Sequence, residues 1–363
     1  MSAALHPSKT IMVMAGGTGG HIFPGLAVAD YLRLEGWNVH WLGNPAGMEY
    51  PMITKRGIAF EGIQFSGLRG KGLEAKMLLP FNLCKALWQS TRILKRIQPN
   101  VLLGMGGYIT FPMGLMAIIM GYPLVLHEQN SIAGLANRVL GKFAGRSLCA
   151  FPEALSNAEW VGNPLRTELL QLPPPTERYK NRSGKLHLLV VGGSLGATIL
   201  NEVIPRALSL IPEDRRPTVM HQSGEKHVES LQNNYEKAGV NAQVLPFIAD
   251  MASAYSAADL VICRAGAMTI AEQTVLAMPA IYIPFASGNG EQSQNVAELV
   301  KDGGGIVISD AEISPTVLVR KIKELLANPA KLHEMSLAAS RHGLRDADKK
   351  VAQSALALAS AHK

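Results

Sequence analysis

Two glycine-rich turns of the same kind occur in the chain, and each follows a short apolar run. The first extends from Gly16 to Gly20 and the second from Gly192 to Gly196. Glycine lets a backbone come close to a ligand, and the N–H groups at the start of a following helix favour anions. The pair therefore predicts two similar α/β domains that face a shared cleft, each with a loop suited to phosphate.

Neither turn completes a stricter nucleotide motif. The dinucleotide fingerprint needs glycine or alanine where Ile22 stands, and no Gly-Lys-Ser/Thr follows the first turn. The second turn matches the Gly-x-Ser-x-Gly elbow of α/β-hydrolases, with Ser194 as the nucleophile. A hydrolase therefore stays open as an alternative, although it leaves the first turn unexplained. A purely structural role for the first turn also stays open.

Polar or glycine-rich turns follow further apolar runs. The turn Gly106-Gly107-Tyr108 follows one run, and four polar residues that start at His127 follow the next. Because ligands bind at the carboxyl ends of the strands in open α/β sheets, we expect both turns to line a ligand site rather than the core. The turn from Arg264 to Glu272 opens a helix whose first N–H groups could take a diphosphate. Gln292 lies in an amide-rich loop suited to sugar hydroxyls.

The elements that position these turns alternate between short β-branched runs and longer amphipathic stretches. This alternation predicts an α/β fold with parallel, doubly wound sheets in two Rossmann-like domains. We expect an N-terminal domain over residues 1–164, a C-terminal domain over 165–344, and a final helix over 345–363 that docks back on the N-terminal domain. The expected strands are residues 10–15, 38–42, 101–105, 124–127 and 147–150, then 187–191, 218–222, 243–245, 260–263, 280–283 and 306–308.

The composition indicates a globular protein with anionic partners. The chain has 363 residues, of which 47% are hydrophobic and 17% charged, and its net charge is +7. Aromatic residues are sparse and no basic stretch is interleaved with them, so a nucleic-acid partner is not expected. A basic and apolar stretch from Phe65 to Lys85 could insert shallowly at an anionic membrane surface, with ordinary helix packing as the alternative.

The chain offers no convincing metal or disulfide pattern. Its three cysteines, Cys84, Cys149 and Cys263, are isolated in apolar runs, which predicts reduced and buried thiols. The His-Glu pair at 127–128 lacks the second histidine of a zinc motif. An Asp-x-Asp pair, Asp346 and Asp348, lies in a charged helical tail, where we expect a solvated face. Neither a metal nor a cofactor is predicted.

Taken together, these segments resemble the MurG family. The family's motifs occur in order as Gly-Gly-Thr-Gly-Gly-His at 16–21, Gly-Gly-Tyr at 106–108, His-Glu-Gln-Asn at 127–130, Gly-Asn-Pro-Leu-Arg at 162–166, Gly-Gly-Ser at 192–194 and the turn at 267–272. The resemblance implies a GT-B fold, in which two Rossmann-like domains face a central cleft. It also implies transfer of N-acetylglucosamine (GlcNAc) from UDP-GlcNAc to lipid I, which makes lipid II for peptidoglycan synthesis. Another GT-B glycosyltransferase that uses a UDP-sugar is the alternative.

The resemblance further implies roles for individual residues and a place in the cell. The acceptor side would include Gly106, Gly107 and Tyr108. The expected location is peripheral, on the cytoplasmic face of the bacterial inner membrane, with cell-wall synthesis proteins as partners. The residues expected to contact UDP-GlcNAc are Thr18, Gly19, Gly20, Asn130, Arg166, Ser194, Ile248, Ala267, Met268, Thr269, Ile270, Ala271, Glu272 and Gln292.

Such a transfer inverts the anomeric centre, because the 4-hydroxyl of the muramoyl sugar attacks C1 of an α-linked donor. It needs a base for that hydroxyl and positive partial charge near the departing UDP. We expect His21 to be the base, since it follows the first turn and histidine is the side chain best suited to proton transfer near neutral pH. Glu128 is the alternative base, and the helix that starts after Gly266 would supply the positive charge.

Overall fold

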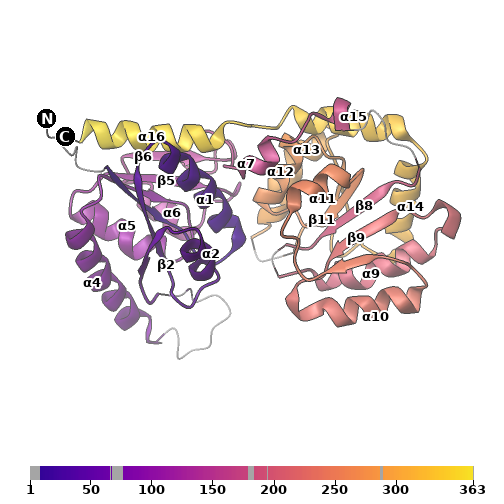
Figure 1. Ribbon diagram of the computed structural model, residues 1–363, viewed down its shortest axis with the longest axis horizontal. Helices are drawn as coiled ribbons and strands as arrows, with labels where there is room; N and C mark the ends of the chain where they lie inside the picture. The colour runs from indigo at the N-terminus through magenta and orange to yellow at the C-terminus, as the bar shows by residue number, and fades with distance from the viewer. Residues whose placement is uncertain are drawn as a thin grey trace, which may run out of the picture. The chain divides into compact units, whose positions relative to one another are not determined.

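The computed structural model describes residues 9–65, 67, 77–178, 184–193, 195–286 and 289–362, which form two compact α/β units (Figure 1). The first unit comprises Met1–Arg166 and Asp346–Lys363, and the second comprises Thr167–Arg345. Ser194 and part of the 65–85 stretch lie outside the described residues.

The first unit is built on a seven-stranded parallel sheet with the order β3-β2-β1-β4-β5-β6-β7. Its strands are β1 (Thr10–Met14), β2 (Asn38–Gly43), β3 (Ala59–Gly62), β4 (Val101–Gly104), β5 (Leu124–Glu128), β6 (Arg146–Cys149) and β7 (Glu159–Trp160). Its helices are α1 (Gly19–Leu34), α2 (Glu49–Lys55), α4 (Leu79–Ile97), α5 (Thr110–Ile119), α6 (Leu135–Leu140) and α16 (Ala347–Ala361).

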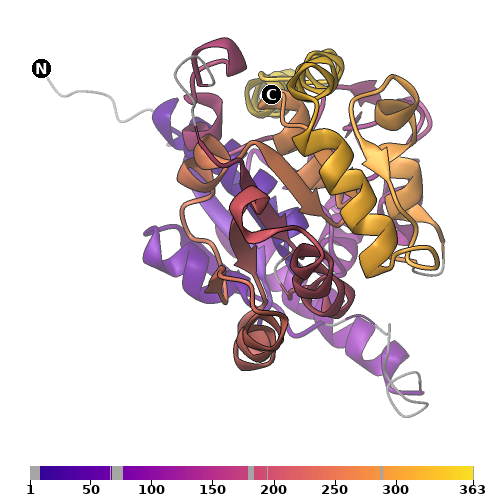
Figure 2. The same cartoon turned by 90° about the vertical axis from the view of Figure 1, so that its right-hand side faces the viewer.

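The second unit repeats this topology in a six-stranded parallel sheet with the order β10-β9-β8-β11-β12-β13. Figure 2, in which this unit faces the viewer, shows helices on both sides of the sheet. Its strands are β8 (His187–Val191), β9 (Thr218–Gln222), β10 (Gln243–Leu245), β11 (Leu260–Cys263), β12 (Ala280–Tyr282) and β13 (Ile306–Val307). Its helices are α7 (Thr167–Leu170), α8 (Pro175–Arg178), α9 (Thr198–Ser209), α10 (Val228–Ala238), α11 (Met251–Ala257), α12 (Ala267–Val275), α13 (Glu291–Lys301), α14 (Pro315–Leu326) and α15 (Pro329–Ser340), with 3-10 turns at Glu213–Arg215 and Glu225–His227.

The central strands are apolar throughout because both of their faces are buried. In β1, Ile11 and Val13 pack into one core cluster, whereas Met12 and Met14 pack into the cluster on the opposite face. Side chains alternate between the faces of a strand, so a strand covered on both sides is apolar on both faces except where a buried polar side chain is hydrogen-bonded. The doubly wound α/β fold predicted from the sequence is confirmed.

The C-terminal helix α16 belongs to the first unit and packs beside α1. Val351, Ala352 and Ala355 are buried in the same core cluster as the apolar face of α1. The expectation that the Asp-x-Asp pair lies on a solvated face is wrong for Asp348, which is 7% exposed. Its side chain lies on the packed face of the helix, and burial raises its pKa above the usual value.

Two other expectations also need correction. Cys149 and Cys263 are buried as predicted, but Cys84 is exposed because it lies on the outer face of α4. Strands β3 and β7 were not expected, since each is a short edge strand with few buried side chains.

The strand orders place the glycine-rich turns at equivalent points. In each sheet the order reverses beside the first strand of the unit, between β1 and β4 or between β8 and β11. Open α/β sheets bind ligands in the crevice at this switch point, beyond the carboxyl ends of the strands. The turns after these strands are therefore the candidate binding loops of each unit.

Candidate active site

The turns after β1 and β4 lie against each other in the first unit. A Cβ atom on Gly107 would lie 2.3 Å from the carbonyl oxygen of Gly16, so only glycine allows this approach. Gly106 has a φ of +91°, and a Cβ atom there would lie 2.6 Å from Nδ1 of His21. We infer that Gly106 leaves room for the His21 ring. Tyr108, in the same turn, is 49% exposed.

His21 begins a chain of hydrogen bonds that runs into the core. Its Nδ1 lies 3.0 Å from Oε1 of Gln129, and Nε2 of Gln129 lies 3.0 Å from Nδ1 of His127. Nε2 of His127 in turn lies 2.8 Å from the carbonyl oxygen of Gly162. Burial lowers the pKa of His127 to about 4, so its ring is neutral at pH 7.

The expectation that the four polar residues 127–130, at the carboxyl end of β5, line a ligand site is wrong for three of them. His127, Glu128 and Gln129 are all at least 98% buried, and Asn130 alone is partly exposed. Each buried polar group has hydrogen-bond partners, as a buried polar group requires. These residues form the support of the site rather than its lining.

Glu128 uses both carboxylate oxygens inside the protein. Oε1 accepts from the backbone N–H and Nδ2 of Asn130, at 3.0 and 3.2 Å. Oε2 accepts from the N–H of Gly134 at 3.1 Å and from Nδ2 of Asn137 at 2.9 Å. A buried carboxylate with four donors holds the loop together, and this arrangement argues against Glu128 as the base.

The start of α1 presents further predicted residues. Thr18 is the N-cap and is exposed, but its side chain makes no capping hydrogen bond. A Cβ atom on Gly19 would lie 2.9 Å from the Phe23 ring, and the guanidinium of Arg166 lies 5.0 Å from the centre of the same ring. Gly20 follows on the first turn and is partly exposed.

In the second unit, α12 begins directly beyond β11 with Gly266 as its N-cap. Glycine has no side chain to cap the helix, and the N-terminus of a helix favours an anion. Met268 and Thr269 are partly exposed on the first turn, as is Ala271 on the next, whereas Ala267 and Ile270 are buried. Ala267 and Ile248, which is 4% exposed, can therefore offer a ligand only their backbone groups. The prediction that Ile270 contacts the donor is not supported, because its N–H already donates to the carbonyl of Gly266 at 3.0 Å.

Two polar side chains of this unit are held in fixed positions. Oε2 of Glu272 accepts a hydrogen bond from the hydroxyl of the fully buried Tyr255 at 2.9 Å. Oε1 of Gln292 accepts from the backbone N–H groups of Ala265 and Phe285, at 3.1 and 2.9 Å. A sugar hydroxyl would consequently be met by the amide N–H groups of Gln292.

The second glycine turn lies against the loop that follows β9. A Cβ atom on Gly196 would lie 1.9 Å from the carbonyl oxygen of Ser223, and Nε2 of Gln222 donates to the carbonyl of Gly193 at 3.1 Å. The two switch-point loops of the first unit make the same kind of close contact. Each unit thus has a compact glycine turn fixed by a neighbouring loop.

Comparisons with known proteins agree with this arrangement. Residues 11–148 match the glycosyltransferase family 28 N-terminal domain, and residues 187–351 match the C-terminal domain of that family. The chain is 53% identical, over 95% of its own length and 97% of the relative, to the UDP-N-acetylglucosamine--N-acetylmuramyl-(pentapeptide) pyrophosphoryl-undecaprenol N-acetylglucosamine transferase of Cupriavidus metallidurans. The chain is also similar to the crystal structure of Acinetobacter baumannii MurG, with a TM-score of 0.80 and 35% identity. The match covers 96% of the chain and 99% of that structure. The chain belongs to the MurG family.

The fold alone does not distinguish this family from others that bind the same nucleotide sugar. The structure of UDP-GlcNAc 2-epimerase from Neisseria meningitidis bound to UDP-GlcNAc has a TM-score of 0.67 with the chain at only 10% identity. The match covers 96% of the chain and 100% of that structure. The GT-B fold is confirmed by the MurG structure. The reaction has to be inferred from the family and from the side chains at the switch points.

Sequence reasoning missed two residues that support the site. Gln129 was recognised only as part of a motif, and Tyr255 was not singled out. Both act through buried hydrogen bonds whose partners are distant in sequence, 108 residues away for Gln129 and 17 for Tyr255. A buried tyrosine gives no signal of its own in a sequence, because its partner Glu272 lies on another helix, α12, and only the fold brings the two side chains together.

An exposed stripe of apolar and basic residues runs along α4 in the first unit. Phe81 is 70% exposed and Trp88 is 58% exposed, and the guanidinium of Arg92 lies 4.9 Å from the centre of the Trp88 ring. Their spacing places them on one face of the helix together with Lys85. Phe65 differs from the expectation, because it is partly buried against the core. Across the described residues, every helix is too short or too polar to cross a membrane.

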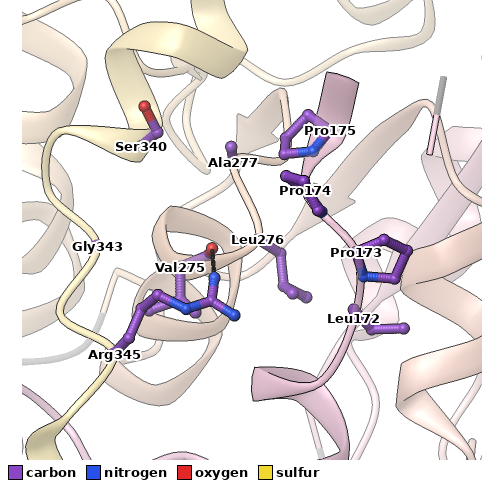
Figure 3. Close-up of a pocket in the computed structure, with 10 residues that line it drawn as sticks. All are labelled: Leu172, Pro173, Pro174, Pro175, Val275, Leu276, Ala277, Ser340, Gly343 and Arg345. Carbon is purple, nitrogen blue, oxygen red and sulfur yellow. Dashed lines mark hydrogen bonds between the residues drawn. The ribbon is translucent and has the colours of Figure 1, made fainter. Parts of the chain in front are cut away.

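A separate cavity of about 210 Å³ lies in the second unit, away from these loops (Figure 3). Prolines 173–175 form one wall and Val275, Leu276 and Ala277 another, and Nη1 of Arg345 donates to the carbonyl of Val275 at 3.1 Å. None of the predicted site residues lines it. We assign it no part in the reaction.

Proposed function

We propose that the chain is an inverting glycosyltransferase that transfers GlcNAc from UDP-GlcNAc to the 4-hydroxyl of the N-acetylmuramoyl sugar of lipid I, forming lipid II. The proposal rests above all on the 53% identity, across nearly the full length of both chains, to a transferase whose name states this donor and this acceptor. The contacts of both switch points support it.

The second unit would bind the donor. The N-terminus of α12, with Gly266 as its N-cap, and the Gly192–Gly196 turn, with Ser194, would stabilise the diphosphate through backbone N–H groups. Glu272, oriented by Tyr255, would accept from the ribose, and the backbone at Ile248 would meet uracil. Gln292 would donate to the GlcNAc.

The first unit would supply the base. In the proposed step, Nε2 of His21 takes the proton of the acceptor's 4-hydroxyl while the oxygen attacks C1 of the GlcNAc. The bond between C1 and the β-phosphate oxygen breaks, and UDP leaves with the electron pair. Because the nucleophile enters opposite the leaving group, an α-linked donor gives a β-1,4 product.

The departing diphosphate would be stabilised by the positive end of α12, worth up to about 2 kcal/mol in a partly buried site. Thr18, Gly19 and Gly20 would contact the donor or the diphosphate of the acceptor, with Asn130 and Arg166 near the transferred sugar. Gly106, Gly107 and Tyr108 would lie on the acceptor side. In this scheme Glu128 orients Asn130 through a hydrogen bond and does not transfer a proton.

The stripe on α4 would hold the enzyme at the membrane that carries its acceptor. Phe81 and Trp88 are large apolar side chains in water, and Lys85 and Arg92 can pair with anionic headgroups. This proposal places the protein peripherally on the cytoplasmic leaflet, where cell-wall synthesis proteins would be its neighbours.

Release of UDP in the presence and absence of a water-soluble lipid I analogue tests the proposed reaction. We expect UDP only when donor and acceptor are both present, together with an equal amount of disaccharide product. UDP release without acceptor would indicate a hydrolase, and formation of an epimeric UDP-sugar would indicate an epimerase. Either result would overturn the proposal. Transfer to a different sugar acceptor but not to the analogue would favour another GT-B glycosyltransferase.

A further inference from the structure

The hydrogen bonds behind His21 have a fixed direction, which is set by two backbone carbonyl groups. The carbonyl of Gly162 can only accept, so the Nε2 of His127 that lies 2.8 Å away must carry a hydrogen. Since burial lowers the pKa of His127 to about 4, this ring holds no second hydrogen at neutral pH. Nδ1 of His127 is consequently an acceptor.

Gln129 passes this direction on to His21. Its Nε2 donates to Nδ1 of His127 at 3.0 Å and to the carbonyl oxygen of His127 at 3.3 Å. Both partners only accept, so the side-chain amide cannot be reversed without losing both bonds. Its Oε1 is thereby turned toward His21, 3.0 Å from Nδ1.

An amide oxygen accepts only, and Nδ1 of His21 must therefore be the donor. A neutral imidazole carries one hydrogen, so the lone pair that can take a proton lies on Nε2. We propose that Gln129 and His127 are positioning residues that hold His21 in the tautomer with hydrogen on Nδ1, leaving Nε2 as the basic atom. The catalytic meaning of this inference rests on the proposed function, whereas the tautomer itself does not.

The surrounding packing agrees with a fixed orientation. Gln129 and His127 are 1% and 0% exposed, and Nδ2 of Asn163 donates to the backbone carbonyl of Gln129 at 3.1 Å. Gly106 lies so close that a methyl group would meet Nδ1 and Cε1 of His21, at 2.6 and 2.8 Å. A side chain fixed in this way needs little reorientation at the moment of proton transfer.

Nitrogen-15 NMR of the full chain with labelled histidine tests the tautomer directly. The His21 signals are those lost in His21→Gln and retained in His333→Gln, a variant of an exposed histidine on α15. At pH 8 we expect the shift of Nδ1 to be that of a protonated nitrogen and the shift of Nε2 that of an unprotonated one. Hydrogen on Nε2, or an even mixture of tautomers, would overturn the proposal.

Two variants of Gln129 separate positioning from simple support of the fold. Gln129→Met removes the acceptor at similar length, and we expect loss of the Nδ1–H tautomer and a fall in kcat of about 10- to 100-fold, with KM for UDP-GlcNAc unchanged. Gln129→Glu restores an acceptor for Nδ1, and we expect it to restore the tautomer. An unchanged tautomer in Gln129→Met would overturn the proposal, and if that variant fails to fold, the wild-type spectrum decides alone. A confirmed tautomer combined with full activity of His21→Gln would support the positioning of His21 by Gln129 and His127, and would refute only the role of His21 as the base.

Discussion

At the scale of single residues, the groups that would touch the substrates are held by buried neighbours. His21 depends on Gln129, and Glu272 depends on Tyr255, each through one hydrogen bond of about 3 Å. Such neighbours fix the orientation of a side chain before the ligand arrives, so part of the ordering cost of binding is met during folding.

Tyr255→Phe should weaken binding of UDP-GlcNAc without slowing the transfer. Loss of a hydrogen bond that orients Glu272 corresponds to about 1 kcal/mol, or about a 5-fold rise in KM for the donor. Steady-state kinetics with the donor varied would measure it. Tyr282→Phe is the matched control, since the Tyr282 hydroxyl is equally buried but has no hydrogen-bond partner among the described residues. Equal KM values for the two variants would refute the role of Tyr255.

The residues of this site differ in how far the sequence reveals them. The glycines and His21 directly follow predicted strands, and Glu272 lies early in the helix after one, so their types and positions pointed to a ligand site before the fold was known. The burial of His127, Glu128 and Gln129 could not be predicted in this way. Polar residues at a strand end usually face solvent. Here Asn137 on α6 and the carbonyl of Gly162 after β7 supply donors and an acceptor that allow these residues to be buried.

At the scale of elements, the position of each loop follows from the parallel sheets. Runs such as 101–105 and 260–263 were recognisable because these strands are buried on both faces and contain no polar side chain. The edge strands β3 and β7 lack this signal. β3 contains Glu61 and Gly62, and β7 has only two residues, both exposed, so neither forms an apolar run.

Gly106→Ala should displace the His21 ring. Alanine at a φ of +91° costs about 1 to 2 kcal/mol in backbone strain, and its Cβ would lie within 3 Å of the ring. We expect kcat to fall at least about 10-fold while the Kd for UDP-GlcNAc stays constant. Gly36→Ala is the control, because Gly36 has a similar φ of +79° but nothing within 4 Å of its Cβ position. A loss of kcat of the same size in both variants would show that strain, and not the contact with His21, is responsible.

The stripe on α4 should govern attachment to anionic membranes. Replacing Phe81 and Trp88 together with serine removes two exposed aromatic side chains, and burial of such a side chain contributes about 1.5 to 3 kcal/mol when complete. We expect at least about a 10-fold loss of binding to phosphatidylglycerol vesicles in a sedimentation assay, with activity on a water-soluble acceptor retained. Leu34→Ser, at an 88% exposed site on α1, should leave vesicle binding unaltered. Full binding by the double variant would reject this surface.

At the scale of the whole molecule, the chain forms one unit, then the second, and then returns to the first. The structure divides it after Arg166 and again after Arg345, and α16 completes the core of the first unit. Sequence periodicity indicated a helix in the tail but could not by itself decide where it packs, because small residues such as Ala352 and Ala355 suit many surfaces.

Stability should fall as the pH is lowered from 7 to 5. Burial lowers the pKa of His127 to about 4 and that of His221 to about 3, so both are neutral when folded but become protonated in the unfolded chain below about pH 6.5. The unfolded state then binds more protons, and each histidine should reduce the free energy of unfolding by about 2 kcal/mol over this interval. Urea titrations at pH 7 and 5 would measure the loss. His221→Gln should reduce it by about half and His333→Gln should not change it, whereas stability independent of pH would contradict the burial of these rings.

In the proposed reaction the first unit supplies a base, His21, for transfer of GlcNAc to a lipid-linked acceptor. A single-turnover reaction of wild type and His21→Gln with UDP-GlcNAc and a lipid I analogue tests it most directly, with the donor Kd measured separately. We predict a β-linked disaccharide and an equal amount of UDP from the wild type. We also predict an unchanged Kd and a transfer rate at least about 100-fold lower in the variant. Transfer by His21→Gln at the wild-type rate, with the same donor affinity, would contradict this role of His21.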